Sequence, residues 1–190
     1  MATNDESIGP AATVQKILAA AAFAARVHAG QKRKGLAGEP YVNHLIEVAE
    51  LIAGSSDELD ANLIMAGLLH DTIEDSGVTA YELEQRFGAD VAGLVVEATD
   101  DKSLPKEIRK ALQVETAPLK SPRAQILKLA DKISNLRSLR DSPPADWSRE
   151  RKRQYGEWAK QVVSGFTKRN GRLQAEFERV YGELMRATDV

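Results

Sequence analysis

Four residues whose side chains can bind a metal ion lie within or beside apolar stretches of this sequence. His70 and Asp71 end the run LIMAGLLHD, His44 stands early in a predicted helix, and Asp131 interrupts ILKLADKI. A single such residue is usually structural, but a buried charge needs a partner, and four are harder to explain in this way. Two imidazoles and two carboxylates leave positions open on a six-coordinate divalent ion for water and a substrate. The chain has no cysteine, so a metal site would depend on His and carboxylate ligands.

Two acidic residues follow the His-Asp pair directly in the sequence HDTIED. If the helix continues, Glu74 lies on the same face as His70, and Asp75 lies one turn beyond Asp71. A carboxylate beside a metal-bound water can orient that water, accept its proton or protonate a leaving phosphate. The alternative is a merely acidic helix end, but carboxylates at a helix C-terminus oppose the helix dipole. We therefore interpret Glu74 and Asp75 as the catalytic residues.

A basic loop precedes the first histidine of this set. Residues 29–39, AGQKRKGLAGE, contain three glycines and three cations, including Arg33 and Lys34. Arginine can stack on a purine ring or bind phosphate through two nitrogens, whereas lysine acts as a point charge. The loop is thus a candidate nucleotide-binding segment, and a solvated surface loop is an equal alternative.

Several further polar residues could contact a substrate. Asn135 and Ser138 fall one and two turns beyond the aspartate of ILKLADKI, on the same helical face. They could meet a base or ribose, or they could be ordinary buried hydrogen-bonding residues. Lys106 and Arg151 are weaker candidates for phosphate contacts, and the pattern around Tyr155 favours packing in the core.

Helices must position all of these residues. Helical periodicity, capping residues and Gly or Pro breaks predict an all-α single domain, with a flexible tail over residues 1–12 and the domain over residues 13–188. No segment shows the alternation typical of a strand. The predicted helices cover about residues 13–28, 40–53, 60–71, 79–87, 89–97, 106–115, 123–140, 148–167 and 172–187.

The composition limits the partners. Hydrophobic residues make up 43% and charged residues 28%, as in a soluble globular protein, and the net charge is -2. No overall field attracts nucleic acid or membrane, and 5% aromatic residues argue against a stacking surface for single strands. The apolar residues 17–25 are too few to span a bilayer and follow acidic residues rather than basic ones. We expect a cytoplasmic protein with a small-molecule ligand, and the sequence does not indicate an oligomeric state.

Five segments together resemble a known family. The chain resembles the hydrolase domain of the RelA/SpoT alarmone enzymes over about residues 13–185, and it resembles the small stand-alone subgroup in particular. The segments that carry the resemblance are HAGQKRK, GEPYVNH, LLHDTIED, RFGADV and LKLADKISNLRSL. The resemblance implies an HD-domain helical bundle of about eight to ten helices that binds one divalent metal ion, with Mn²⁺ favoured. It implies these roles: metal ligands His44, His70, Asp71 and Asp131; catalytic Glu74 and Asp75; nucleotide contacts Arg33, Lys34, Asn135 and Ser138; phosphate pocket Lys106, Arg151 and Tyr155.

The implied reaction is hydrolysis of the 3′-pyrophosphate of (p)ppGpp, which gives GDP or GTP and pyrophosphate. The chain leaves no room for the synthetase domain of the long enzymes, so we expect degradation alone. Two departures from the long enzymes are Leu45, where many relatives have proline, and a loop two residues longer between Lys34 and Pro40. An alternative is removal of the 2′-phosphate of NADPH, as some relatives of this subgroup do. A non-catalytic nucleotide sensor or a helical adaptor would leave the complete set of ligands and acids unexplained.

Overall fold

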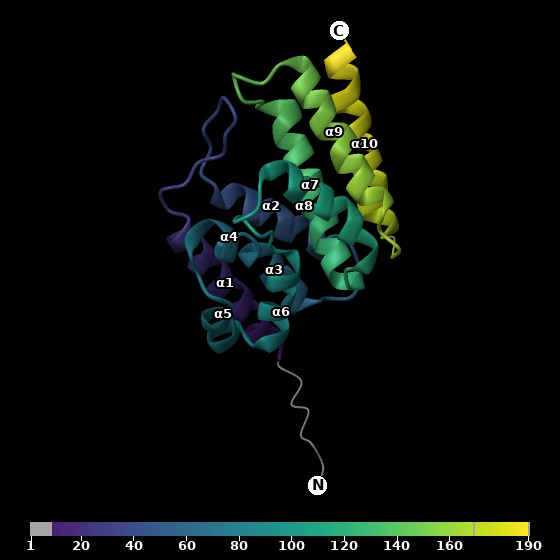
Figure 1. Ribbon diagram of the computed structural model, residues 1–190. Coiled ribbons are helices and arrows are strands. Elements are labelled where there is room, and N and C mark those ends of the chain that lie inside the picture. The colour runs from purple at the N-terminus through teal and green to yellow at the C-terminus, as the bar shows by residue number, and fades with distance from the viewer. Residues whose placement is uncertain (1–8, 169, 190) are drawn as a thin grey trace.

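The structure, a computed structural model, describes residues 9–168 and 170–189, and within these ranges it is built of helices with no β-strand. The predicted all-α fold is confirmed. Figure 1 shows the helices, which are α1 (Pro10–Val27), α2 (Val42–Ala53), α3 (Ala61–Leu69), α4 (Thr72–Ser76), α5 (Ala80–Phe87), α6 (Ala89–Ala98), α7 (Lys106–Thr116), the short 3₁₀ helix η1 (Ala117–Leu119), α8 (Pro122–Asp141), α9 (Arg149–Ser164) and α10 (Gly171–Asp189).

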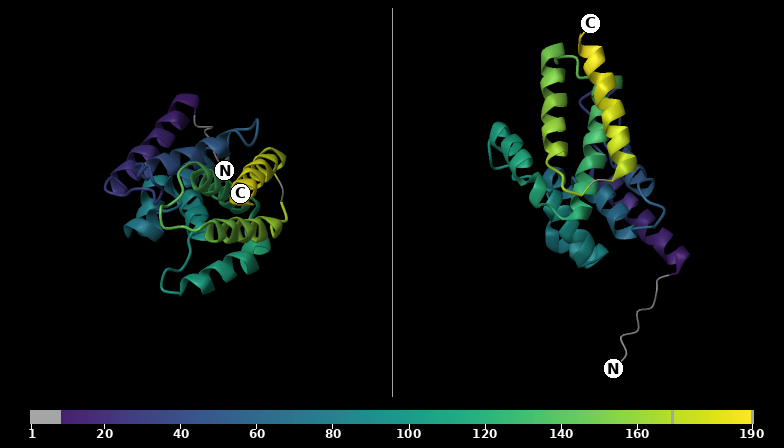
Figure 2. Two further views of the ribbon diagram at one scale, coloured as in Figure 1. Left: turned by 90° about the horizontal axis from the view of Figure 1, so that it is seen from above. Right: turned by 90° about the vertical axis from the view of Figure 1, so that its right-hand side faces the viewer.

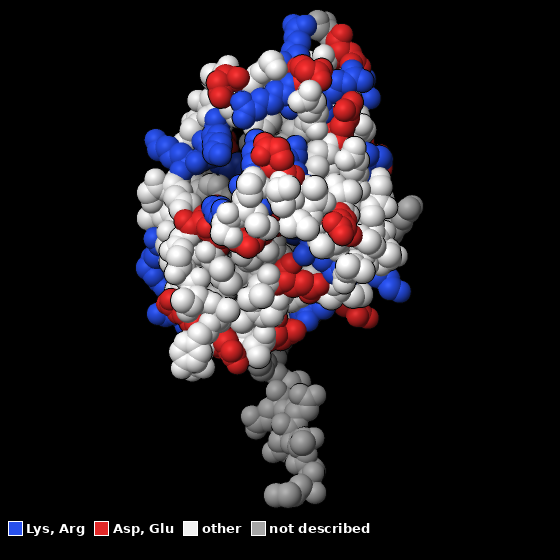
Figure 3. Space-filling view, in the orientation of Figure 1, with Lys and Arg blue, Asp and Glu red and all other residues white. Residues whose placement is uncertain are grey.

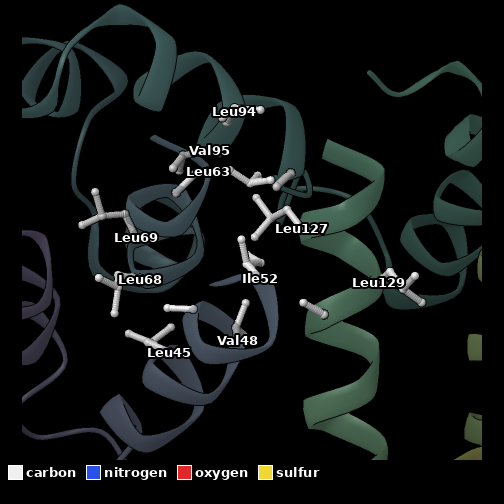
Figure 4. Close-up of a cluster of buried hydrophobic side chains, with 14 of the residues drawn as sticks. Leu45, Val48, Ile52, Leu63, Leu68, Leu69, Leu94, Val95, Leu127 and Leu129 are labelled. Atoms are coloured by element: carbon white, nitrogen blue, oxygen red, sulfur yellow. The ribbon is translucent and has the colours of Figure 1, made fainter. Parts of the chain in front are cut away.

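Helix α3 lies at the centre of the fold. Its residues from Leu63 to Leu69 are all buried, and it packs against α1, α2, α6 and α8. Gly67 permits the close contact with α2, because a Cβ there would lie 2.7 Å from Ile52 Cδ1 and 3.3 Å from Ala49 Cα. Figure 4 shows how side chains of four helices meet around it: Leu45, Val48 and Ile52 of α2, Leu63, Leu68 and Leu69 of α3, Leu94 and Val95 of α6, and Leu127 and Leu129 of α8.

Helix α8 joins this core to the C-terminal helices. It packs against α2 and α6 on one side and against α9 and α10 on the other, and the right-hand view of Figure 2 shows the three long helices side by side. Most of its residues from Ala124 to Leu139 are buried, which accounts for the long apolar run in the sequence. Helix α7 has no buried residue and packs on α9 and η1 at the periphery.

The chain breaks its helix at the predicted His-Asp pair. We expected His70 and Asp71 inside one helix over residues 60–71, but α3 ends at Leu69 and both residues form the turn before α4. His70 Nδ1 donates to the carbonyl of Gly67 over 2.8 Å, and Thr72 Oγ1 donates to the carbonyl of Leu69 over 2.7 Å. These side chains take up two of the carbonyl groups that a helix end leaves without backbone partners.

The break also changes the setting of the acidic pair. Glu74 and Asp75 lie in the first turn of α4, which ends after five residues at Gly77 with φ of 71°. They are therefore not at the C-terminal end of a longer helix, and the dipole argument made from the sequence does not apply.

The N-terminal helix starts earlier than the sequence predicts. It begins at Pro10, and Thr13 Oγ1 donates to the carbonyl of Gly9 instead of capping a helix that starts after it. Residues 10–12 of the predicted tail are therefore helical, while residues 1–8 lie outside the described part of the chain. Thr79 caps α5, because its Oγ1 accepts from the Glu82 amide over 3.1 Å. Among the described residues, no helix is long and apolar enough to cross a lipid bilayer.

Candidate metal centre

The four predicted ligands come together from three parts of the chain. His44 stands on α2, His70 and Asp71 form the turn after α3, and Asp131 stands on α8. Ligand atoms of His44, His70 and Asp131 all lie within 4.8 Å of one another. Asp71 is not part of that group of three, but its Oδ2 is 3.6 Å from His44 Nε2 and 3.1 Å from His70 Nε2.

Both imidazoles direct Nε2 toward the carboxylates. Asp131 Oδ1 is 3.4 Å from His44 Nε2 and 3.8 Å from His70 Nε2. The Nδ1 atom of each ring makes a hydrogen bond outside the centre. His70 Nδ1 donates to the Gly67 carbonyl, and His44 Nδ1 lies 2.8 Å from Ser134 Oγ. Among the described residues, the buried Nε2 of His70 has no hydrogen-bond partner. This is the arrangement in which histidine binds a metal through one nitrogen while the other is held in place.

Charges within the centre keep both of its carboxylates ionised. Burial lowers the pKa of His44, and the opposing pull of Asp131 does not restore it. Burial also acts to lower the pKa of His70, but Asp71 and Asp131 outweigh it and raise that pKa to about 10. Burial acts to raise the pKa of both carboxyls, yet His70 beside Asp71 and Lys132 beside Asp131 hold each pKa well below its usual range.

This donor set fits a divalent metal ion. Imidazole and carboxylate are the ligands of Mn, Fe, Zn and related ions, and His70 Nε2 makes no hydrogen bond among the described residues that an ion would have to replace. Two anionic carboxylates in a buried pocket repel each other unless a positive charge lies between them. A divalent ion would supply that charge more effectively than the proton on His70.

Three neighbours hold the two carboxylates. Tyr41 donates its hydroxyl to Asp71 Oδ2 over 2.6 Å, and burial together with Asp71 raises the pKa of this tyrosine, so it stays protonated. Asn135 Nδ2 donates to Asp131 Oδ1 over 2.6 Å, and Lys132 Nζ lies 3.1 Å from Asp131 Oδ2. Tyr41 and Lys132 were not predicted from the sequence. Their signals were an aromatic residue one turn before His44 and a lysine directly after Asp131 in an apolar run.

The acidic pair on α4 faces one cation from the loop between α6 and α7 and one from α7 itself. Lys102 Nζ pairs with Asp75 Oδ1 and lies 3.8 Å from Glu74 Oε1, while Arg109 Nη1 lies 3.6 Å from the same Glu74 oxygen. Burial, followed by the charges of Asp100 and Asp71, raises the pKa of Glu74. Lys102 and Arg109 were not predicted; Lys102 lies in the polar loop after α6, and Arg109 lies on α7.

The basic loop reaches the same region through Arg33. Its Nη2 donates to Asn135 Oδ1 over 3.2 Å and its Nε donates to Ser138 Oγ over 3.4 Å, so three of the predicted nucleotide contacts meet. The Ala37 amide donates to Ser142 Oγ over 2.9 Å, which ties the loop to the end of α8. A pocket of about 380 Å³ lies here, lined by residues that include Arg33, His44 and Ser138. Figure 3 shows Lys and Arg side chains gathered around a hollow in the upper half of the face.

Three other predicted contacts are exposed. Lys34 and Lys106 are exposed. Arg151 is also exposed, lies 3.6 Å from Asp146 and stacks over the Trp147 ring at 4.4 Å.

Tyr155 is half-buried between two tryptophans. Its ring centroid lies 5.7 Å from that of Trp147 and 5.2 Å from that of Trp158, so the packing expected from the sequence is confirmed. Burial, and after it the charge of Asp131, raises the pKa of Tyr155, which indicates that this ring also lies near the centre.

Comparison with known proteins places this geometry in context. The profile of the HD domain family matches residues 20–172. The human protein named guanosine-3′,5′-bis(diphosphate) 3′-pyrophosphohydrolase MESH1 is 48% identical over 166 residues, which cover 87% of this chain and 93% of that protein. The Drosophila melanogaster protein of the same name is 43% identical over 159 residues, which cover 84% of this chain and 89% of that protein.

A solved structure gives the same fold. It is described as a metazoan ortholog of SpoT that hydrolyzes ppGpp, and it matches with a TM-score of 0.84 at 42% identity. The match covers 88% of this chain and 94% of that one. The family match over residues 20–172 includes α2, α3 and α8, the helices that bring the candidate ligands together.

Proposed function

Because this chain belongs to the HD domain family, and within it to the group of the MESH1 pyrophosphohydrolases, we propose that it hydrolyses the 3′-pyrophosphate of (p)ppGpp. The products are GDP or GTP and pyrophosphate. One observation carries the proposal: two Nε2 atoms and two carboxylates meet at a buried point next to a pocket whose lining includes Arg33 and His44.

We propose that His44, His70, Asp71 and Asp131 hold one Mn²⁺ ion. When bound, such an ion supplies Lewis acidity and makes a water molecule acidic enough to give hydroxide near neutral pH. The chain prepares this site before any ion binds, because Tyr41, Asn135 and Lys132 orient the carboxylate oxygens.

Glu74 and Asp75 are the groups that move protons in this proposal. The pKa of Glu74 is raised, which brings it closer to neutral pH, where proton transfer is most efficient. Lys102 and Arg109 lie against the acidic pair and would also offset phosphate charge on the substrate. A general acid or base placed in this way typically contributes about 10²- to 10⁴-fold to the rate.

The nucleotide itself would bind at Arg33, Asn135 and Ser138. The described contacts of Arg33 are to neutral side chains, so its guanidinium keeps a charge that a phosphate or a purine face can use. Tyr155, beside the centre, is a second candidate contact. Lys34, Lys106 and Arg151 are exposed and would serve the outer part of the substrate.

Product analysis tests the proposal. Purified protein is incubated with ppGpp in MnCl₂, with and without excess chelator, and the products are separated by anion-exchange chromatography. We expect GDP and pyrophosphate in a 1:1 ratio only when manganese is present. The exposed-site variant Glu50→Gln should behave as wild type, and His70→Gln should be inactive.

A parallel incubation with NADPH at the same concentration separates the alternative substrate. Release of NADH and phosphate at a higher kcat/KM than ppGpp turnover would reject the alarmone as the main substrate. GDP with two single phosphates in place of pyrophosphate would reject the reaction itself.

A further inference from the structure

Two side chains that the proposed reaction does not use lie behind His44. Its Nδ1 is 2.8 Å from Ser134 Oγ, and Ser134 is fully buried on α8. Ser134 Oγ in turn lies 2.5 Å from Glu47 Oε2, one turn after His44 on α2. The chain of contacts therefore runs from one candidate ligand, across two helices, to a carboxylate that does not belong to the centre.

The proton of Ser134 determines the direction of both hydrogen bonds. Glu47 Oε1 accepts from Arg137 Nη1 over 2.8 Å, and a carboxylate held by a guanidinium has no proton to donate. Ser134 must then donate its single hydroxyl proton to Glu47. Its oxygen can only accept from the other side, so His44 donates from Nδ1, and the neutral form of the ring then leaves Nε2 bare.

This arrangement opposes the local preference of the ring. Asp131 Oδ1 and Asp71 Oδ2 lie 3.4 and 3.6 Å from His44 Nε2, and both would favour a proton on that nitrogen. A proton there would have to leave before an ion could bind. A neutral ring with Nδ1 protonated is the form that can bind a metal through Nε2.

We propose that Glu47, acting through Ser134, is a positioning residue that holds His44 in the Nδ1–H tautomer and so keeps Nε2 free for a divalent ion. The inference rests on the metal centre of the proposed function. Partners of this kind typically contribute about 10- to 100-fold to metal affinity.

The C-terminal helix supports the same carboxylate. Arg137 binds Glu47 through Nη1, and its Nη2 donates to Glu176 Oε1 of α10 over 2.6 Å. This link orients Arg137 between two carboxylates, so α10 stabilises a centre to which it gives no ligand.

The variant Glu47→Gln gives a sharp test, because it changes the direction of the hydrogen bonds without changing their positions. With its carbonyl on Arg137, the glutamine presents its NH₂ to Ser134 and donates to it. Ser134 must then donate to His44 Nδ1, which moves the imidazole proton to Nε2. The exposed Glu50, on the same helix, provides the control Glu50→Gln.

Two measurements test the inference: the tautomer of His44 in the metal-free protein, and the affinity for manganese. The chain has only three histidines, so long-range ¹H–¹⁵N spectra can resolve the tautomer of His44. We expect Nδ1–H in wild type and Glu50→Gln, and Nε2–H in Glu47→Gln. Calorimetric titration with MnCl₂ should show about 10- to 100-fold weaker binding for Glu47→Gln.

The opposite results overturn the inference. It is wrong if His44 keeps the Nδ1–H tautomer in Glu47→Gln, or if that variant binds manganese within twofold of wild type. Ser134→Ala should weaken manganese binding by a similar factor. If loss of this buried hydroxyl prevents folding, the result for Glu47→Gln alone tests the inference. Failure of wild type itself to bind manganese would instead reject the proposed function, and the tautomer result would stand separately.

Discussion

Replacement of Glu74 by glutamine should separate chemistry from metal binding. If Glu74 transfers a proton during hydrolysis, Glu74→Gln loses about 10²- to 10⁴-fold in kcat. At about 1.36 kcal/mol for each factor of ten, this loss corresponds to about 2.7–5.4 kcal/mol of transition-state stabilisation. The side chain is not one of the candidate ligands, so manganese binding should persist.

The structure also predicts the effect of this change on stability. Glu74 is paired at 3.6 and 3.8 Å with Arg109 and Lys102, and Lys102 is about half exposed, so these pairs contribute at most about 1 kcal/mol. Burial and the charges of Asp100 and Asp71 oppose this stabilisation, and they raise the pKa of Glu74. A raised carboxyl pKa means that the charged form is disfavoured in the folded state, so the group stabilises least at neutral pH. We expect Glu74→Gln to be as stable as wild type at pH 7, or slightly more stable.

The assay combines steady-state kinetics with thermal unfolding in a manganese titration. At 100 times Kd, a ligand stabilises the native state by about 2.7 kcal/mol, which for a domain of this size raises Tm by roughly 5–11 °C. Glu74→Gln should keep this rise while losing turnover. Full turnover in the variant would refute the assigned role, and loss of the manganese-induced rise would show that Glu74 acts on the ion instead.

Three other changes test separate parts of the site. Asp131→Asn should abolish both turnover and the manganese-induced rise in Tm, and urea unfolding without metal should show a loss of about 3 kcal/mol because Lys132 stays buried without its carboxylate. Arg33→Ala should raise KM for ppGpp about tenfold with a smaller change in kcat, whereas an unchanged KM would exclude Arg33 from the nucleotide site. Hydrogen bonds from Arg179 and Arg137 lower the pKa of Glu176 from 4.5 to about 2, although burial acts to raise it. Its stabilisation, at most about 1 kcal/mol, is therefore present above about pH 4.5 and is lost as pH falls through about 2. Urea unfolding of wild type and Glu176→Gln at pH 7 and pH 3 should show a difference that shrinks at the lower pH.

The sequence alone predicted the fold class, and it indicated which residues to propose for the metal centre. Apolar periodicity and capping residues predict most helices, because burial of one helical face and the satisfaction of helix ends are local properties. Charged and imidazole side chains at buried positions stand out for a similar reason, since such groups are costly without partners. His44, His70, Asp71 and Asp131 could therefore be selected before any coordinates were known.

Tertiary structure decided where the helix breaks and which side chains support the ligands. The end of α3 at Leu69 depends on side-chain hydrogen bonds from His70 and Thr72, which no periodicity reveals. The pairing of Ser134 and Glu47 behind His44 requires α2 and α8 to lie side by side, although the two residues are 87 positions apart in the sequence. Contacts of this kind depend on how helices that are distant in sequence pack across the core. The residue type at a single position does not reveal them.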